Sequence, residues 1–387
     1  MDLTYSEAEE AFRREARSWL EANVPRTRLA SGDTREGFTE HVAWEKKLHA
    51  ARWAVVSWPA RHGGRDASLI EWLIFEEEYY RAGAPSRVTQ NGIFLLAPTL
   101  FAFGTEEQKD RILPRMAAAE ELWAQAWSEP NAGSDLASIK STAERVEGGW
   151  RLHGQKTWCT RGAFCDKIFG LFRTDPKAER HRGMSYFMVP LRADGVSVNP
   201  VRRLDGDEGF AEVFLDGVFV PDRDLIGKVN EGWKVAMTTT SSERGLTLRS
   251  PGRFQATAAR LVELYRRSRA TASPALRERV IQAWIDAEAY QLYTLASVTR
   301  LIDGTAKGPE SSLNKLFWSE LDVSLHQTAL DLLGARAELV AGAPDAADEG
   351  AWIKGYQFAL AGPIYAGTNE IQKNVVAERL LGLPRST

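Results

Sequence analysis

The sequence predicts an α+β multidomain protein with an N-terminal helical domain, a middle β-barrel-like domain and a C-terminal antiparallel helical bundle. The chain has 387 residues, which is too long for one ordinary core. Its hydrophobic pattern is helical up to about residue 122, changes to short strand-like runs, and returns to helical spacing from about residue 230. We therefore expect domains at residues 1–122, 123–229 and 230–387.

The N-terminal domain is predicted from a helix-start signal and from helical spacing. Ser6 and Glu9 stand at the spacing of a capping box, and Phe12 and Ala16 follow at intervals that place them on one helix face. A turn-rich stretch covers residues 58–64, where glycine and proline interrupt the pattern. Further helical patterns cover residues 68–82, 91–103 and 105–119.

The middle domain is predicted from short apolar runs separated by turn signals. Pairs such as Asp194-Gly195 and Asp216-Gly217 lie between the runs and are typical of tight hairpin turns. This spacing favours a compact all-β domain of about 100 residues. The expected strands cover residues 123–128, 150–156, 166–172, 185–191, 196–201 and 211–220.

The C-terminal domain is predicted from long helical patterns with short connections, which is typical of an antiparallel bundle. No Gly-rich βαβ fingerprint occurs, so a nucleotide cofactor would have to be held without a Rossmann domain. The patterns cover residues 231–269, 275–303, 310–341, 350–360 and 368–381.

Composition excludes several classes of function. The net charge of −3 carries no basic surplus for nucleic acid, and no apolar run approaches the roughly 20 residues that span a bilayer. The six histidines never pair with cysteines at metal-ligand spacing, so we expect no metal site. Cys159 and Cys165 are expected to be free thiols. With an acidic N-terminus that lacks a targeting signal, these features favour a cytoplasmic protein.

The stretch from Trp127 to Asp135, Trp-Ser-Glu-Pro-Asn-Ala-Gly-Ser-Asp, resembles the signature of the acyl-CoA dehydrogenase family. That family carries Thr/Ser-Glu-Pro-x-x-Gly-Ser-Asp at the entry to its β domain. Other family-like stretches lie before and after it in the family's order, and the resemblance covers essentially the whole chain. They are Gly104–Lys109, Gly154–Thr160, Val218–Pro221 and Ile364–Gln372.

The resemblance implies an FAD cofactor and assigns residues to it. Tryptophans and short hydroxyl residues suit the flat aromatic flavin ring and its polar edges, although each alone could equally be packing in a β domain. By resemblance, Ser134 also contacts the bound acyl-CoA. The expected cofactor residues are Trp127, Ser128, Gly133, Ser134, Trp158, Thr160, Thr368 and Glu370.

The position of the catalytic base departs from the commonest family pattern. Many members carry a glutamate directly before the C-terminal Gly-Thr, and here that position is Ala366. A second subset carries its base on the first long helix after the β domain, where this chain has Glu243. Glu243 lies on a stripe of small residues with Ala236 and Thr240, which leaves room for a ligand. The alternative is a solvated glutamate beside Arg244.

The resemblance implies a mechanism of α,β-dehydrogenation of an acyl-CoA thioester to the trans-2-enoyl-CoA. Glu243 takes the α-proton, the backbone N–H of Ala366 polarises the thioester carbonyl, and flavin N5 accepts the β-hydride. Arg244 orients the carboxylate or meets the CoA portion. An electron-accepting flavoprotein or another electron carrier then reoxidises the flavin.

Two further departures concern the cofactor and the assembly. The family's Arg-x-x-Phe-Gly run is absent from residues 267–274, and its Gly-Gly adenine contact reads Leu333-Gly334-Ala335. The sequence is therefore compatible with a homo-oligomer and with a mixed oligomer that contains a homologous chain. It also does not select the acyl chain of the substrate, which could be branched, long, cyclic or steroid-like. Two alternatives keep the fold, namely a non-catalytic or half-site subunit of a mixed tetramer and a flavin monooxygenase or oxidase.

Overall fold

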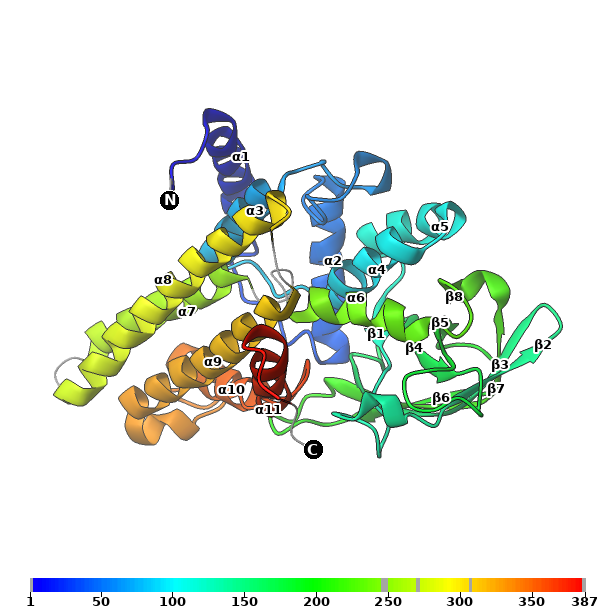
Figure 1. Ribbon diagram of the computed structural model, residues 1–387. Helices are drawn as coiled ribbons and strands as arrows, with labels where there is room; N and C mark the ends of the chain where they lie inside the picture. The colour runs from blue at the N-terminus through cyan, green and yellow to red at the C-terminus, as the bar shows by residue number, and fades with distance from the viewer. Residues whose placement is uncertain (1–2, 245–249, 269–271, 306–307, 385–387) are drawn as a thin grey trace. The chain divides into compact units, whose positions relative to one another are not determined.

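The computed structural model describes residues 3–244, 250–268, 272–305 and 308–384, without the side chains of residues 241–244. The chain forms two compact units, whose elements are labelled in Figure 1. The helical unit comprises Met1–Val24, Ser68–Ala84 and Arg244–Thr387, and the mixed unit comprises Pro25–Ala67 and Pro85–Glu243. The predicted order of helices, strands and helices is confirmed.

The helical unit gathers two N-terminal helices with the C-terminal bundle. Helix α1 begins with the predicted capping box, in which the Ser6 hydroxyl accepts a hydrogen bond from the Glu9 N–H at 3.3 Å. The unit's core includes Phe254, Trp318 and Trp352. Its helices are α1 (Glu7–Asn23), α3 (Leu69–Arg81), α7 (Pro251–Ser268), α8 (Pro274–Ile302), α9 (Ser311–Leu333), α10 (Ala351–Ala359) and α11 (Asn369–Val375), with 3-10 turns η5 (Gly308–Glu310), η6 (Gly334–Glu338) and η7 (Ala347–Gly350) and π-helix η8 (Val376–Leu380).

Two of the predicted bundle helices were too long. The pattern at residues 231–269 divides into α6 (Gly232–Arg244) and α7, which begins at Pro251. Proline has no N–H to donate and its fixed φ suits the first position of a helix, so it starts α7 rather than continuing α6. The pattern at residues 310–341 ends as an α-helix at Leu333, because Gly334 takes a positive φ of 56°.

The mixed unit contains helices that flank the β-sheet segments in sequence. Helix α2 (Arg35–Ala50) was not among the predicted elements, although Phe38, Trp44 and Leu48 are buried along it. The predicted helix at 91–103 begins as a π-helix, η2 (Asn91–Leu96), before α4 (Ala97–Phe103). The other helices are α5 (Glu106–Ala117) and α6, with 3-10 turns η1 (Ala60–His62), η3 (Leu136–Ser138) and η4 (Asp222–Asp224).

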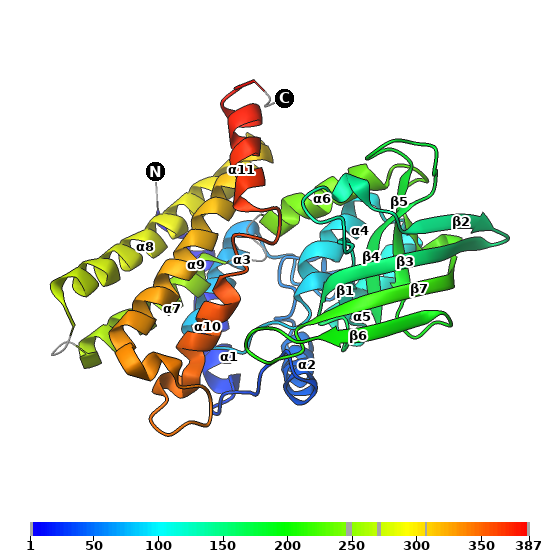
Figure 2. The same cartoon turned by 90° about the horizontal axis from the view of Figure 1, so that it is seen from below.

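The strands form one sheet with the order β6-β7-β3-β2-β4-β5-β8, and β1 pairs in parallel with β4. Figure 2 shows β6, β7 and β3 side by side. Gly195 takes a positive φ in a turn, as the Asp194-Gly195 signal predicted. The turn predicted at Asp216-Gly217 is wrong, because Gly217 takes its positive φ inside strand β7. The strands are β1 (Trp123–Gln125), β2 (Thr142–Val146), β3 (Gly149–Thr160), β4 (Lys167–Arg173), β5 (Met184–Pro190), β6 (Val196–Val201), β7 (Phe210–Pro221) and β8 (Leu225–Ile226).

Candidate functional site

The segment after β1 places the indole of Trp127 inside the mixed unit. Trp127 is only 8% exposed, and its Nε1–H donates to the hydroxyl of Tyr186 at 3.2 Å. The carbonyl of Ser128 accepts a hydrogen bond from the N–H of Thr157 on β3 at 2.9 Å. The indole therefore packs in the core of the mixed unit, and the cofactor roles of Trp127 and Ser128 stay predictions.

A buried ion pair that the sequence analysis missed fastens this segment to β3. The Nζ of Lys156 lies 2.8 Å from Glu129 Oε1 and donates to the carbonyl of Leu171 at 2.8 Å. Burial alone would raise the pKa of Glu129, but Lys156 and the N–H groups of Lys140 and Ser141 outweigh it and lower the pKa. Burial lowers the pKa of the Lys156 ammonium, and the Glu129 carboxylate opposes that shift. Glu129 belongs to the Ser-Glu-Pro signature, and that position was the feature of the sequence that could have drawn attention to it.

The turn at Gly133 and Ser134 is exposed. A Cβ added to Gly133 would meet no described protein atom within 4 Å, and its φ lies outside the left-handed region. Neither packing nor backbone geometry of the described chain requires glycine there. An open glycine backbone on an exposed turn is suited to close approach by a ligand.

Trp158 occupies the most unusual backbone position among the predicted cofactor residues. It lies at a β-bulge, where the register of β3 against β7 shifts between Lys156 and Cys159. Its φ is 58°, which is rare for a bulky residue, and its side chain is 59% exposed. Bulges of this kind redirect side chains and are common beside active sites. The ring packs edge-on against Phe210, with centroids 5.6 Å apart.

The residues that follow Trp158 are held firmly. Cys159 and Cys165 are free, as predicted, and both are buried, which raises the pKa of each thiol to about 12. Neither thiol is therefore a nucleophile at neutral pH. Thr160 ends β3, and its carbonyl accepts a long 3.5 Å hydrogen bond from Asn91 at the start of the π-helix.

In the helical unit, Ala366 lies in a tight left-handed turn. Ala366 has φ 57° and Gly367 has φ 79°. The side-chain amide of Gln372 donates to the carbonyls of both residues, at 3.1 and 3.3 Å. Within the described ranges, no backbone carbonyl accepts a hydrogen bond from the Ala366 N–H. The turn thus holds its carbonyls and leaves a backbone donor at the predicted position.

Two side chains on α9 hold Asn369, which follows this turn as the first residue of α11. The sequence patterns did not predict this cluster. Asn369 Oδ1 accepts hydrogen bonds from Lys315 Nζ at 2.7 Å and from Ser319 Oγ at 3.1 Å. All three residues are buried. The hydroxyl of Thr368 accepts from the Ile371 N–H as the N-cap of α11, and Glu370 is exposed. Thr368 therefore has a structural role as well as its predicted cofactor role.

Two predicted site residues have side chains outside the described part of the chain. Glu243 and Arg244 are the last residues of α6, and only their helical backbone is described. The altered stretch at 267–274 is also partly outside, since residues 269–271 are not described. The roles of these residues remain predictions.

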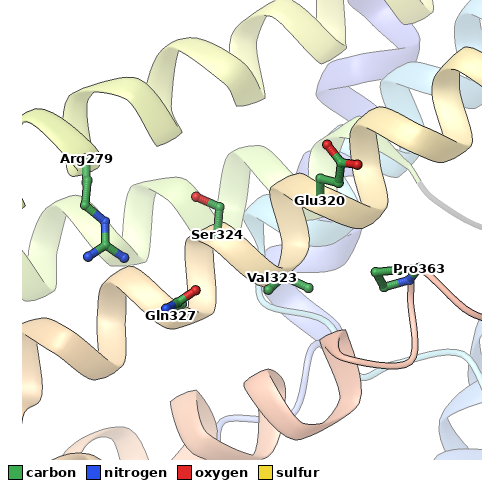
Figure 3. Close-up of a pocket in the computed structure, with 6 residues that line it drawn as sticks. All are labelled: Arg279, Glu320, Val323, Ser324, Gln327 and Pro363. Carbon is green, nitrogen blue, oxygen red and sulfur yellow. The ribbon is translucent and has the colours of Figure 1, made fainter. Parts of the chain in front are cut away.

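A hollow of about 510 Å³ lies on the helical unit (Figure 3). It contains none of the predicted site residues, so we do not assign the chemistry to it. Among the described residues, no helix could cross a membrane and no group of three or more acidic, histidine or cysteine side chains could hold a metal ion. The lining residues are Arg279 on α8, Glu320, Val323, Ser324 and Gln327 on α9, and Pro363 before α11.

The chain belongs to the acyl-CoA dehydrogenase family, which confirms the predicted enzyme class. Models of the three family domains match in order along the chain. The acyl-CoA dehydrogenase N-terminal domain matches residues 6–120, the middle domain 124–218 and the C-terminal domain 230–381.

The relatives extend over the whole chain. It is 40% identical over 390 residues to acyl-CoA dehydrogenase IpdE1 of Mycobacterium tuberculosis (strain ATCC 25618 / H37Rv), covering 97% of this chain and 98% of the relative. The solved Tcur3481-Tcur3483 steroid ACAD is 28% identical with a TM-score of 0.89, and each chain is covered completely. The ChsE4-ChsE5 complex from Mycobacterium tuberculosis is 29% identical with a TM-score of 0.84, again with 100% coverage of both chains.

Proposed function

We propose that this chain is an FAD-dependent dehydrogenase that converts an acyl-CoA thioester to the trans-2-enoyl-CoA. The observation that carries the proposal is Trp158, a large aromatic residue held exposed on a left-handed bulge inside a family signature. A strained, exposed aromatic is retained where a ligand uses it, since solvent exposure and backbone strain both disfavour it otherwise.

The residues of the mixed unit fit an FAD molecule. The exposed face of Trp158 suits a flat aromatic ring, and the open backbone at Gly133 suits a phosphate or ribityl group. Ser128, Ser134 and Thr160 supply hydroxyl groups beside them in sequence. We further propose that Thr368 and Glu370 contribute to the same cofactor. Bound FAD would supply the acceptor for the β-hydride.

The chain's own residues perform the proton chemistry in this proposal. Glu243 removes the α-proton, and the Ala366 N–H donates to the thioester oxygen as negative charge develops there. The left-handed turn supports the second role, because it holds the carbonyls of Ala366 and Gly367 on Gln372. A fixed donor of this kind is worth roughly 2.7–4 kcal/mol of barrier. Arg244 would orient the carboxylate or the CoA portion.

The substrate class that we propose is a bulky thioester of the steroid-derived type. The support is the solved relative described as a steroid ACAD, and the small residues Ala236 and Thr240 that precede Glu243 on α6. The electrons would leave to a flavoprotein or another carrier.

A mixed oligomer with a homologous chain is a second proposal, which would make this chain a subunit with half of a composite site. Two solved relatives are described by paired names, Tcur3481-Tcur3483 and ChsE4-ChsE5. Helix α8 also exposes Ile281, Trp284, Ile285 and Leu292 at helical spacing, which is an apolar stripe suited to a partner.

The test is an anaerobic titration of the FAD-loaded chain with octanoyl-CoA, isovaleryl-CoA and a steroid side-chain acyl-CoA, beside Glu243→Gln. Bleaching of the flavin by the steroid thioester, abolished in the variant, supports the reaction, its base and its substrate class. Bleaching that persists in Glu243→Gln rejects the base. A chain that stays inert until a homologous partner is added supports the half-site subunit instead.

A matched glycine variant tests the cofactor site without turnover. Gly133→Ala should leave the thermal stability of the apoprotein unchanged, because the added Cβ meets no described protein atom within 4 Å. Its affinity for FAD, followed by flavin fluorescence, should fall. Unchanged FAD affinity would show that the cofactor does not approach this turn.

A further inference from the structure

Four side chains from separate elements form a continuous hydrogen-bonded chain inside the mixed unit. Trp127 Nε1–H donates to Tyr186 Oη at 3.2 Å, Tyr186 Oη lies 3.3 Å from Thr239 Oγ1, and Thr239 Oγ1 lies 2.7 Å from Thr99 Oγ1. The Thr99 hydroxyl donates to the carbonyl of Leu95 at 2.8 Å. We call these side chains the Trp-Tyr-Thr-Thr chain. It links the segment after β1 to β5, α6 and α4.

The Trp-Tyr-Thr-Thr chain lies in the interior. Tyr186, Thr239 and Thr99 are fully buried, and Trp127 is nearly so. Buried hydroxyl groups are costly unless each finds a partner, and phenylalanine or valine would fill the same space without that requirement. Packing alone therefore does not explain why these positions carry hydroxyl groups.

The proton directions are consistent along its whole length. The Thr99 hydroxyl donates to the Leu95 carbonyl at 2.8 Å, and Thr239 reaches the Val235 carbonyl of its own helix only at 3.4 Å. The assignment that uses the shorter contacts therefore has Thr239 donating to Thr99 at 2.7 Å. Tyr186 then donates to Thr239 and accepts from Trp127, whose indole can only donate. Each hydroxyl both donates and accepts. Chains of this kind are cooperative and hold their members in one geometry.

The chain acts on α6 one turn before its proposed base. In Figures 1 and 2, α4 and α6 lie close together, and the Thr99–Thr239 contact joins them. Glu243 follows Thr239 by four residues, which places both positions on the same face of the helix. A hydrogen bond at Thr239 fixes the rotation of α6 about its own axis. It thereby fixes the direction that position 243 faces, one turn further along the helix.

We propose that Thr239 is a positioning residue for the Glu243 base, held in place by Tyr186 and Thr99 and tied through Trp127 to the predicted cofactor segment. The inference rests on the proposed function, because it assumes that Glu243 removes the α-proton. A misplacement of about 1 Å at a reacting group costs up to about a hundredfold in rate. The Trp-Tyr-Thr-Thr chain prevents that misplacement.

The test compares Thr239→Val, which keeps the shape and removes the hydroxyl, with Thr239→Ser, which keeps the hydroxyl. Tyr186→Phe interrupts the same chain from β5. The matched control is Thr328→Val, since Thr328 is an equally buried helical threonine whose hydroxyl donates only to the carbonyl of Ser324, at 2.7 Å. Each full-length, FAD-loaded variant is reacted with the panel thioester that bleaches wild type fastest, across a range of pH.

A second readout isolates proton removal, namely exchange of the thioester α-hydrogen into D2O followed by NMR. Thr239→Val and Tyr186→Phe should slow both bleaching and exchange by about tenfold to a hundredfold. The apparent pKa of the acid limb should move, while KM changes less than about threefold. Thr239→Ser should recover most of the rate, and Thr328→Val should match wild type.

Full rates and an unchanged pH profile in Thr239→Val overturn the inference and leave the proposed function intact. So does a loss that Thr239→Ser fails to rescue while near-UV circular dichroism shows damaged packing, because the role is then structural. Wild-type rates in Glu243→Gln overturn the inference and reject Glu243 as the base, while bleaching by the thioester still supports the dehydrogenase reaction.

Discussion

Replacing Glu129 with glutamine is expected to destabilise the mixed unit by about 3 kcal/mol or more, because it leaves the Lys156 ammonium buried without its counter-charge. Lys156 is fully buried, and its remaining partners are all uncharged, namely the carbonyls of Leu171 at 2.8 Å and Trp127 at 3.4 Å, the Phe172 ring at 4.7 Å and the amide oxygen of the new glutamine. Glutamine preserves the shape of the side chain, so the loss of stability measures the contribution of the negative charge.

The converse substitution, Lys156→Met, should cost less. Glu129 would still accept hydrogen bonds from the N–H groups of Lys140 and Ser141, at 2.6 and 3.0 Å. Each such charge-assisted bond contributes about 1.5–3 kcal/mol. The double variant carries no unpaired charge, so its loss should be smaller than the sum of the two single losses by about 1.5 kcal/mol or more.

Differential scanning calorimetry measures these differences. For a unit of about 200 residues, 3 kcal/mol corresponds to a fall of about 6–12 °C in Tm. Arg61→Gln is the control, because Arg61 and Glu106 form an exposed pair at 3.1 Å and exposed pairs contribute little. Additive losses in the double variant, or a fall in Glu129→Gln no larger than in Arg61→Gln, would refute the reasoning.

Two further predictions concern titratable groups. Burial alone would raise the pKa of Glu78, but hydrogen bonds from Arg17 and Arg81 outweigh it and lower the pKa to about 2. The stabilisation is therefore present above the ordinary value of 4.5 and is lost as the pH falls towards about 2, so urea denaturation should show Glu78→Gln less stable than wild type at neutral pH and nearly equal at about pH 2. The buried thiols of Cys159 and Cys165 should resist a thiol reagent in the native protein at about pH 8 and react only in denaturant; rapid native labelling would contradict their burial.

The local features of the fold were predictable from the sequence. The capping box at Ser6, the turn at Asp194-Gly195 and the change of hydrophobic period depend on residues only a few positions apart, and all appear in the structure. The ordered family motifs also identified the enzyme class. Helix α2 was not predicted, and α6 and α7 were predicted as one helix, because helical spacing alone does not locate helix ends.

The tertiary structure decided which polar groups meet. Glu129 and Lys156 are 27 residues apart, and Thr99 and Thr239 are 140 apart, so no local pattern could pair them. The same holds for Trp127, where the motif indicated a cofactor residue and the fold buried the indole on Tyr186. Local sequence sets the period and ends of each element through backbone sterics and short-range hydrogen bonds. Which buried polar groups satisfy one another depends on how distant elements pack, and only the folded chain determines that.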